Sequence, residues 1–271
     1  MKPWMRTVMV TMPTMLVIAA CATVPVTERR QLQLISRSEL LEMSFSQYDE
    51  FLAESSVITG TPEAEMVSRV GRRIADAVEA HMREIGREDE VRDYAWEFSL
   101  IDDESVNAFA MPGGKIAIFS GILPVARDET GLAVVMGHEV AHTVAGHGSE
   151  RMSQVLLTQL GGMALSTAIR EEPETARNLW LAAYGLGAQV GVLLPYSRLH
   201  ESEADRLGMI FMAMAGYDPR EAADFWQRMA DAREGAEPPE FVATHPPDDR
   251  RISDLEDALP EAMQHYETGS R

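Results

Sequence analysis

Two histidines and a glutamate near the middle of the chain form a pattern that could bind a metal ion. His138, Glu139 and His142 read H-E-x-x-H. Residues four apart lie on the same face of an α-helix, so both imidazoles would point toward one ion. Imidazole nitrogen suits Zn²⁺, and a carboxylate beside a catalytic zinc can act as general base on a water molecule. The pattern predicts a hydrolytic metal centre, provided that a third ligand exists.

The sequence before this motif favours a mostly buried helix. The run from Glu129 to Met136 is apolar at helical spacing and contains no proline. The alternative is a pair of solvated histidines on a helix surface. Metal binding is the better interpretation, because buried polar side chains need partners.

A third ligand is available about sixty residues further along the chain. Glu201 and Asp205 are four apart and would share a helical face. Glu201 can bind the metal, while Asp205 can accept the free N–H of a ligating histidine and fix its tautomer. A solvated acidic start of a helix would show the same spacing. Spacing alone leaves both interpretations open.

The composition indicates a single globular domain and excludes some partners. The chain has 271 residues, of which 45% are hydrophobic and 25% are charged, enough for a sizeable core. Its formal charge is -19, so we expect no electrostatic binding to nucleic acid.

The N-terminus reads as an export signal. Lys2 and Arg6 precede an apolar run, and the stretch from Ile18 to Cys21 resembles a bacterial lipobox. We interpret residues 1–20 as a lipoprotein signal peptide, residues 21–37 as the lipidated Cys21 and a tether, and residues 38–271 as the domain. An ordinary signal peptide or a short membrane anchor is the alternative. Because Ala22 replaces the aspartate that retains bacterial lipoproteins in the inner membrane, the periplasmic side of the outer membrane is the expected location.

Hydrophobic periodicity predicts a mainly helical α+β fold with a small sheet beside the motif helix. The run from Leu179 to Pro195 is expected to be a buried helix or a mobile flap beside the site. On a continuing helix His147 would point away from His142, so it either supports a ligand from outside or lies at the surface. Besides the motif helix, the expected helices cover residues 38–53, 62–87, 151–170, 220–232 and 252–266, with a strand over 93–102 and a hairpin over 106–119.

Together these motifs resemble the M48 family of gluzincin metallopeptidases. The resemblance rests on H-E-x-x-H followed by Glu201-x-x-Ala204-Asp205, on the segment Val106 to Gly114, and on Thr244-His245-Pro246-Pro247 with Arg251. The lipobox followed by residues 29–32 resembles the small periplasmic lipoprotein branch of that family. The resemblance to family M48 implies a zincin-like domain that contains one Zn²⁺ per chain.

The resemblance also implies a role for each matching residue. His138, His142 and Glu201 would bind Zn²⁺, and Glu139 would be the general base. His245 would be a fourth ligand or would lie near the transition state, with Arg251 close to the site. Substrate would be bound along the exposed edge of a strand at Asn107, Ala108 and Phe109. A strand buried in the core sheet is the plainer interpretation of that segment, and both can hold.

The expected function is zinc-dependent endopeptidase action in the bacterial envelope on misfolded or unassembled proteins. The alternative is a periplasmic chaperone or adaptor whose zinc site is kept latent by the His245 loop, residues 234–249. A purely structural zinc site is disfavoured, since it needs neither a base nor Asp205. Expected partners are unfolded or misassembled proteins, a membrane reached through the lipid anchor, and envelope-assembly proteins.

Overall fold

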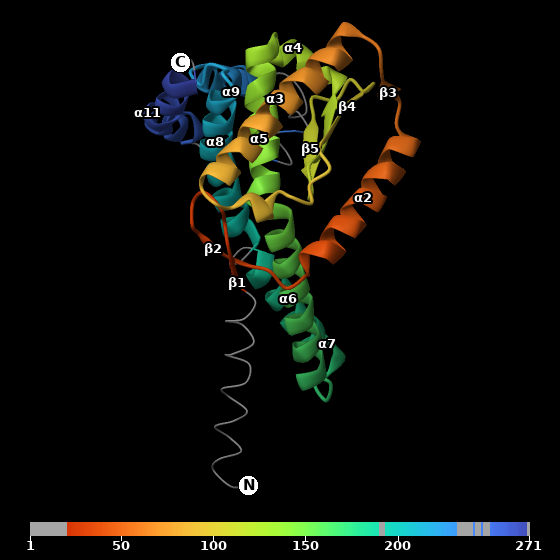
Figure 1. Ribbon diagram of the computed structural model, residues 1–271. Coiled ribbons are helices and arrows are strands. Elements are labelled where there is room, and N and C mark those ends of the chain that lie inside the picture. Colours follow the sequence, from red (N-terminus) through yellow and green to blue (C-terminus); the bar gives the residue numbers. More distant parts are fainter. Residues whose placement is uncertain (1–20, 190–192, 232–240, 242–244, 246–249, 270–271) are drawn as a thin grey trace.

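A computed structural model describes residues 21–189, 193–231, 241, 245 and 250–269 (Figure 1). The predicted signal peptide, residues 1–20, therefore lies outside the described part. The helices of the described part are α2 (Arg37–Glu54), α3 (Pro62–Glu84), α4 (Leu123–Ala126), α5 (Glu129–Val144), α6 (His147–Ala168), α7 (Glu174–Ala188), α8 (Leu194–Met214), α9 (Glu221–Asp231) and α11 (Arg251–Gly269). Its strands are β1 (Cys21–Thr23), β2 (Arg30–Leu32), β3 (Val57–Ile58), β4 (Glu97–Ile101), β5 (Ala108–Met111) and β6 (Lys115–Phe119). The α+β, mainly helical class is confirmed.

The central element is α5, which carries the H-E-x-x-H motif. Asp128 caps its N-terminus by accepting hydrogen bonds from the amides of Thr130 and Gly131. Every residue from Gly131 to Ala141 is buried, which confirms the expected burial of this helix. The helix packs against α8, α3 and β5, so its two histidines are held by the core itself.

Two glycines let the helices that carry the metal ligands approach closely. A Cβ on Gly137 of α5 would lie 2.6 Å from the Gly208 carbonyl oxygen of α8, and one on Gly208 would lie 2.8 Å from the His138 amide. Any larger side chain would force the helices apart. The contact therefore sets the distance between the histidines of α5 and the carboxylates of α8.

A four-stranded sheet in the order β3-β4-β6-β5 flanks α5 (Figure 1). Strands β4 and β6 are parallel, and the β5–β6 hairpin is antiparallel as expected. Phe119 donates to the Asn107 carbonyl (3.1 Å), so alternate amides, including that of Ala110, point away from β6. Strand β5 lies at the edge of the sheet, beside the motif helix.

The segment from 21 to 37 is not a free tether. Strands β1 and β2 pair as a hairpin, and Val24 in the turn between them is completely buried. Arg29 forms 2.8 Å ion pairs with Glu150 and Glu203. Part-buried ion pairs and apolar packing thus join this segment to the rest of the described chain, while the expected domain start at residue 38 stays a prediction.

Helices α6 and α7 form a hairpin that projects from the domain (Figure 1). The expected burial of the 179–195 run is wrong for its described residues: the exposed fractions are 72% for Leu179 and 57% for Trp180. Helix α7 is covered on one face only, where Tyr184 donates to the Thr158 carbonyl of α6 (2.9 Å). No helix in the described ranges is both long and apolar enough to cross a membrane.

Candidate metal centre

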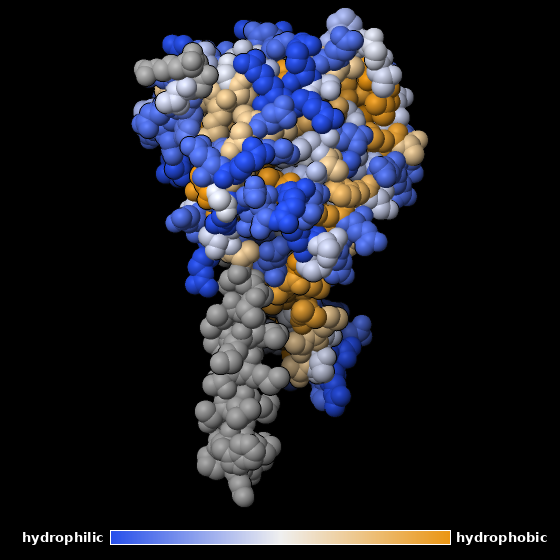
Figure 2. All heavy atoms as spheres, in the orientation of Figure 1, coloured by the Kyte–Doolittle hydropathy of each residue, from blue (hydrophilic) through white to orange (hydrophobic). Residues whose placement is uncertain are grey.

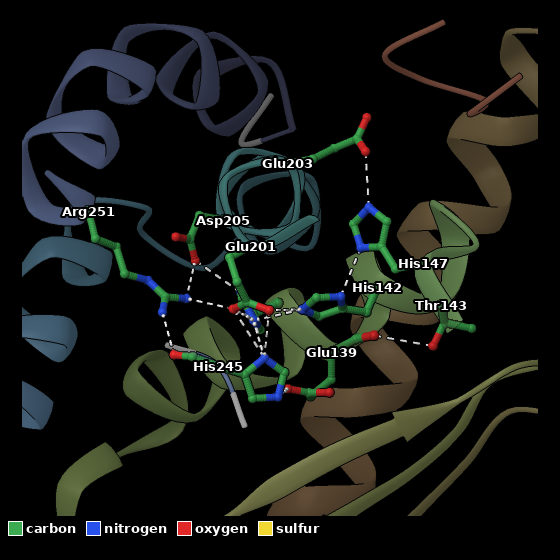
Figure 3. A network of polar contacts seen from close by, with 10 residues as sticks. Glu139, His142, Thr143, His147, Glu201, Glu203, Asp205, His245 and Arg251 are labelled. Carbon is green, nitrogen blue, oxygen red and sulfur yellow. Dashed lines mark hydrogen bonds and ion pairs between the residues drawn. The ribbon is translucent and has the colours of Figure 1, made fainter. Parts of the chain in front are cut away.

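Four side chains from three segments converge at the middle of α5 (Figure 3). The Nε2 atoms of His138 and His142 are 3.0 Å apart. The carboxylate oxygens of Glu201, from α8, lie 3.4 and 3.5 Å from these nitrogens. His245 Nδ1 lies 3.2 Å from both His138 Nε2 and the Glu201 carboxylate. The structure therefore brings together all four ligands expected from the sequence.

The spacing of these atoms fits a tetrahedral zinc site. Ligand atoms bound to zinc at about 2.0–2.1 Å lie about 3.3 Å from each other in a tetrahedron. The distances above, 3.0 to 3.5 Å, bracket that value. Imidazole nitrogens and a carboxylate oxygen are also the donors that zinc prefers. Without a cation, the facing lone pairs of His138 and His142 would repel each other.

Asp205 binds the ring nitrogen of His138 that does not face the other ligands, and Arg251 binds Asp205. His138 Nδ1 donates to Asp205 (2.9 Å), which leaves Nε2 as the donor atom toward the metal. Burial lowers the pKa of His138, but the bonds to Asp205 and Glu201 outweigh it and raise that pKa to about 9. Arg251 in turn donates to Asp205 (2.6 Å), and its guanidinium lies 3.2 Å from the centre of the Trp226 ring. The expected positions of Asp205 and Arg251 near the site are thus found.

His142 is supported by His147, which is one of the two roles expected for this residue. The Nδ1 atoms of the two histidines are 2.8 Å apart, and His147 Nε2 lies 3.0 Å from Glu203 (Figure 3). His147 does not continue the helix of His142, because Gly146, with a φ of 70°, ends α5 and starts α6 in a new direction. Because Glu203 accepts from Nε2, His147 Nδ1 is the acceptor for the Nδ1–H of His142. This chain of bonds presents His142 Nε2 to the metal.

Glu203 is itself fixed by the N-terminal hairpin. It accepts from Arg29 Nε (2.8 Å) and from the Thr27 hydroxyl. Burial alone would raise the pKa of Glu203, but the hydrogen bonds from His147, Thr27 and Arg29 outweigh it and lower the pKa to about 2. Glu150 extends the network by pairing with Arg29 and His200 (2.9 Å). A continuous path of polar contacts thus runs from Arg29 to the ligand His142.

Replacing His147 by alanine should weaken zinc binding about 10- to 100-fold, because His142 loses the group that fixes its tautomer. Competition with a chelating dye measures this. An asparagine side chain would keep an acceptor near the Nδ1 position, so His147→Asn should recover part of the affinity. His81→Ala, on the remote α3, is the control for histidine removal. Equal affinities for His147→Ala and the wild type would refute the supporting role.

Glu139 does not join the four ligands but lies beside them. Its side chain is 1% exposed, and its carboxylate is 3.6 Å from His245 Nε2. Burial raises the pKa of Glu139, against the opposing effects of His245 and His138 and of the Ala110 backbone amide. A carboxyl group with a raised pKa in this position can take a proton from a water molecule and release it again.

A cavity of about 380 Å³ opens over the ligands and extends along β5. Phe109 and Ala110 line it together with Glu139 and His142. The side chains of Asn107 and Ala108 are buried, and the Asn107 side chain accepts from the Ala108 amide (2.9 Å). Of the three expected substrate-binding residues, Phe109 is the one that lines this cavity. Ala110, which was not predicted, also lines it, and its backbone amide faces Glu139.

The segment that carries His245 crosses the start of this edge. Phe241 donates from its backbone to the Val106 carbonyl (3.0 Å), and His245 donates to the Phe241 carbonyl (2.8 Å). The Phe241 ring is fully buried and stacks on Trp226 at 5.6 Å. The expected lid, residues 234–249, otherwise lies outside the described residues.

A buried H-E-x-x-H helix, a glutamate ligand from a second helix and an edge strand beside them define a metal-dependent peptidase. The model of peptidase family M48 matches residues 68–259, and the chain belongs to this family.

Relatives agree with this assignment. The chain is 35% identical over 250 residues to the mitochondrial metalloendopeptidase OMA1 of Schizosaccharomyces pombe, covering 90% of this chain and 68% of the relative. It is 31% identical over 251 residues to OMA1 of Saccharomyces cerevisiae, with 90% and 70% covered. It is 34% identical over 165 residues to a putative beta-barrel assembly-enhancing protease of Vibrio cholerae, with 58% and 33% covered.

Proposed function

We propose that this metallopeptidase uses zinc to cut misfolded or unassembled proteins of the bacterial cell envelope. The observation that carries the zinc assignment is the cluster of His138, His142, Glu201 and His245, whose ligand atoms all lie within 4.8 Å of one another. The envelope location is supported by the lipobox that ends at Cys21 and by bacterial relatives named beta-barrel assembly-enhancing protease.

Each side chain in the site has a task in peptide hydrolysis. When bound, zinc polarises the scissile carbonyl and acidifies a water molecule. Glu139 takes the proton from that water and passes it to the leaving amine. Asp205 and His147 accept the Nδ1 protons of His138 and His142, which directs the Nε2 atoms of both histidines toward the other ligands. No covalent intermediate with the chain is required.

An extended substrate fits the outer edge of β5, the end strand of the described sheet. Main-chain hydrogen bonds to an edge strand bind a peptide with little regard to its sequence, which suits unfolded substrates. A strand added beside Phe109 and Ala110 would lie near Glu139, since all three residues line the same cavity. Most backbone groups of a folded protein are already paired, so unfolded chains are the substrates that this mode of binding favours.

A second candidate function, a chaperone or adaptor with a latent zinc site, is favoured by one observation. His245 Nδ1 takes the position where a catalytic zinc site keeps room for water, as its 3.2 Å distances to His138 and Glu201 indicate. A site with four protein ligands binds metal without turning over substrate. In this form the protein would hold unfolded chains at β5 and cut them only when His245 moves away.

Cleavage of unfolded casein by the purified chain tests the proposed function. We expect slow fragmentation that stops when a chelator removes the metal and returns when one equivalent of Zn²⁺ is added, because all four ligand atoms serve a single ion. Casein that stays intact with zinc bound, while binding to the chain, would favour the chaperone. Cleavage that continues in the metal-free chain would refute both.

A further inference from the structure

Exposed apolar side chains gather on the α6–α7 hairpin. Within the described ranges, this hairpin contributes eight of the 13 exposed large hydrophobic residues, while the other five are scattered over other elements. Figure 2 shows the apolar surface continuing from the body of the domain onto the projecting helices. We call these eight residues the hairpin face: Val155, Leu156, Leu157, Leu160, Met163, Leu179, Trp180 and Leu186.

The flanks of the hairpin carry no charge. No charged residue occurs between Arg151 and Arg170, or between Arg177 and Arg198. Residues 151–189 contain three arginines and three glutamates, so the hairpin is neutral in a chain whose formal charge is -19. Its charges lie mainly at the tip, around Glu171 and Glu172. A cluster of eight exposed apolar side chains without interspersed charges indicates an interaction site.

The N-terminal end of the described chain lies at the base of this hairpin. In the β1–β2 pair Cys21 is opposite Leu32. Leu32 lines a cavity of about 430 Å³ together with Leu157 and Tyr184 of the hairpin. In addition, the Leu34 amide donates to Ser153 of α6 (3.0 Å). A lipid on Cys21 would therefore attach the chain to a membrane next to the hairpin face.

We propose that the hairpin face rests on the surface of a lipid bilayer. The inference relies on the proposed function for the membrane anchor, and on the structure for the position and polarity of the face. A neutral, apolar surface can approach lipid where the acidic remainder of the chain would be repelled by anionic headgroups. Trp180 suits the interface between headgroups and acyl chains, and the charged tip stays among the headgroups.

This orientation also places the catalytic cavity close to the bilayer. Gln154, Val155 and Gln189, at the base of the hairpin, line the same cavity as Glu139 and His245. A bilayer against the hairpin face would bring the mouth of the site near the lipid surface. The substrates reached first would be extended chains at or near the membrane, rather than chains free in solution.

Fluorescence of Trp180 tests the inference in the full chain attached to phosphatidylcholine vesicles that carry bromine on their acyl chains. Trp180→Phe is measured in parallel, and the difference isolates Trp180 from the other three tryptophans. Bromine quenches only on contact, so we expect the Trp180 emission to fall about twofold relative to unbrominated vesicles, as for a residue in the interface. The double variant Leu179→Glu with Leu186→Glu should lose this quenching.

Met43→Glu with Val57→Glu is the matched control, because both side chains are exposed hydrophobics outside the hairpin. This variant should keep the quenching of Trp180. Unquenched Trp180 in chains that are attached to the vesicles would overturn the proposal. Trp180 shielded from both bromine and aqueous acrylamide would mean that a protein, such as a second copy, covers the face, and would overturn it too.

Casein cleavage measured in the same samples separates the two proposals. A chain that cuts casein but shows no quenching refutes only the bilayer contact. A chain that shows quenching but does not cut refutes only the peptidase assignment. The hairpin variants should keep their activity on dissolved casein, since none of the substituted residues contacts the metal ligands.

Discussion

Replacing Glu139 by glutamine should abolish peptide cleavage and leave zinc binding intact. The substitution keeps the size of a side chain that is 1% exposed, so packing is preserved. Glu139 is not one of the four ligands, so the metal content should not change. Loss of a general base typically costs about 10²- to 10⁴-fold in rate, and we expect the upper part of that range.

Casein cleavage and zinc content are measured on the same preparation of the Glu139→Gln chain. Glu84→Gln, on the exposed end of α3, is the matched control and should cleave like the wild type. Retained cleavage in Glu139→Gln would contradict the assigned mechanism. Loss of zinc together with activity would mean that Glu139 supports the metal rather than the reaction.

Replacing His245 by alanine should raise the rate of casein cleavage. His245 Nδ1 lies within 3.2 Å of His138 and of Glu201, where it fills the fourth position of a tetrahedral site. Removing it opens that position to water, and three protein ligands are sufficient for a catalytic zinc site. If the closed arrangement dominates in the wild type, we expect a gain on the order of tenfold.

The measurement compares the initial cleavage rates of His245→Ala, the wild type and His265→Ala. His265 lies beside His81 (6.2 Å between ring centres), remote from the metal ligands, and its removal should change nothing. A fall in rate for His245→Ala with zinc still bound would show that His245 acts on the reacting groups. The chain would then be a constitutive peptidase rather than a latent one.

Local patterns in the sequence predicted each half of the site separately. His138 and His142 are one helical turn apart, and so are Glu201 and Asp205, so each pair lies on one face of its own helix whatever the rest of the chain does. That the two pairs face each other across two helices could be expected only from the resemblance to family M48. The helix period does not extend across the sixty residues between them.

Other parts of the site depend on contacts that no short-range pattern contains. Arg29 and Glu203 are 174 residues apart in sequence, yet they form the ion pair that fixes His147. The position of His147 follows from the turn at Gly146, whereas a continued helix would point the same side chain away. The Ala110 amide reaches Glu139 only because the alternation of β5 and the packing of α5 combine.

The sequence by itself determined the chemistry: two histidines, a base and a glutamate ligand at helical spacing in an apolar, mainly helical domain. The tertiary structure decided what surrounds that chemistry. It joined the 21–37 segment to the domain, because Arg29 finds buried carboxylates on α6 and α8. It also left the apolar α7 exposed, because a helix is buried only if other elements reach it, and within the described residues α6 is the helix that packs on α7.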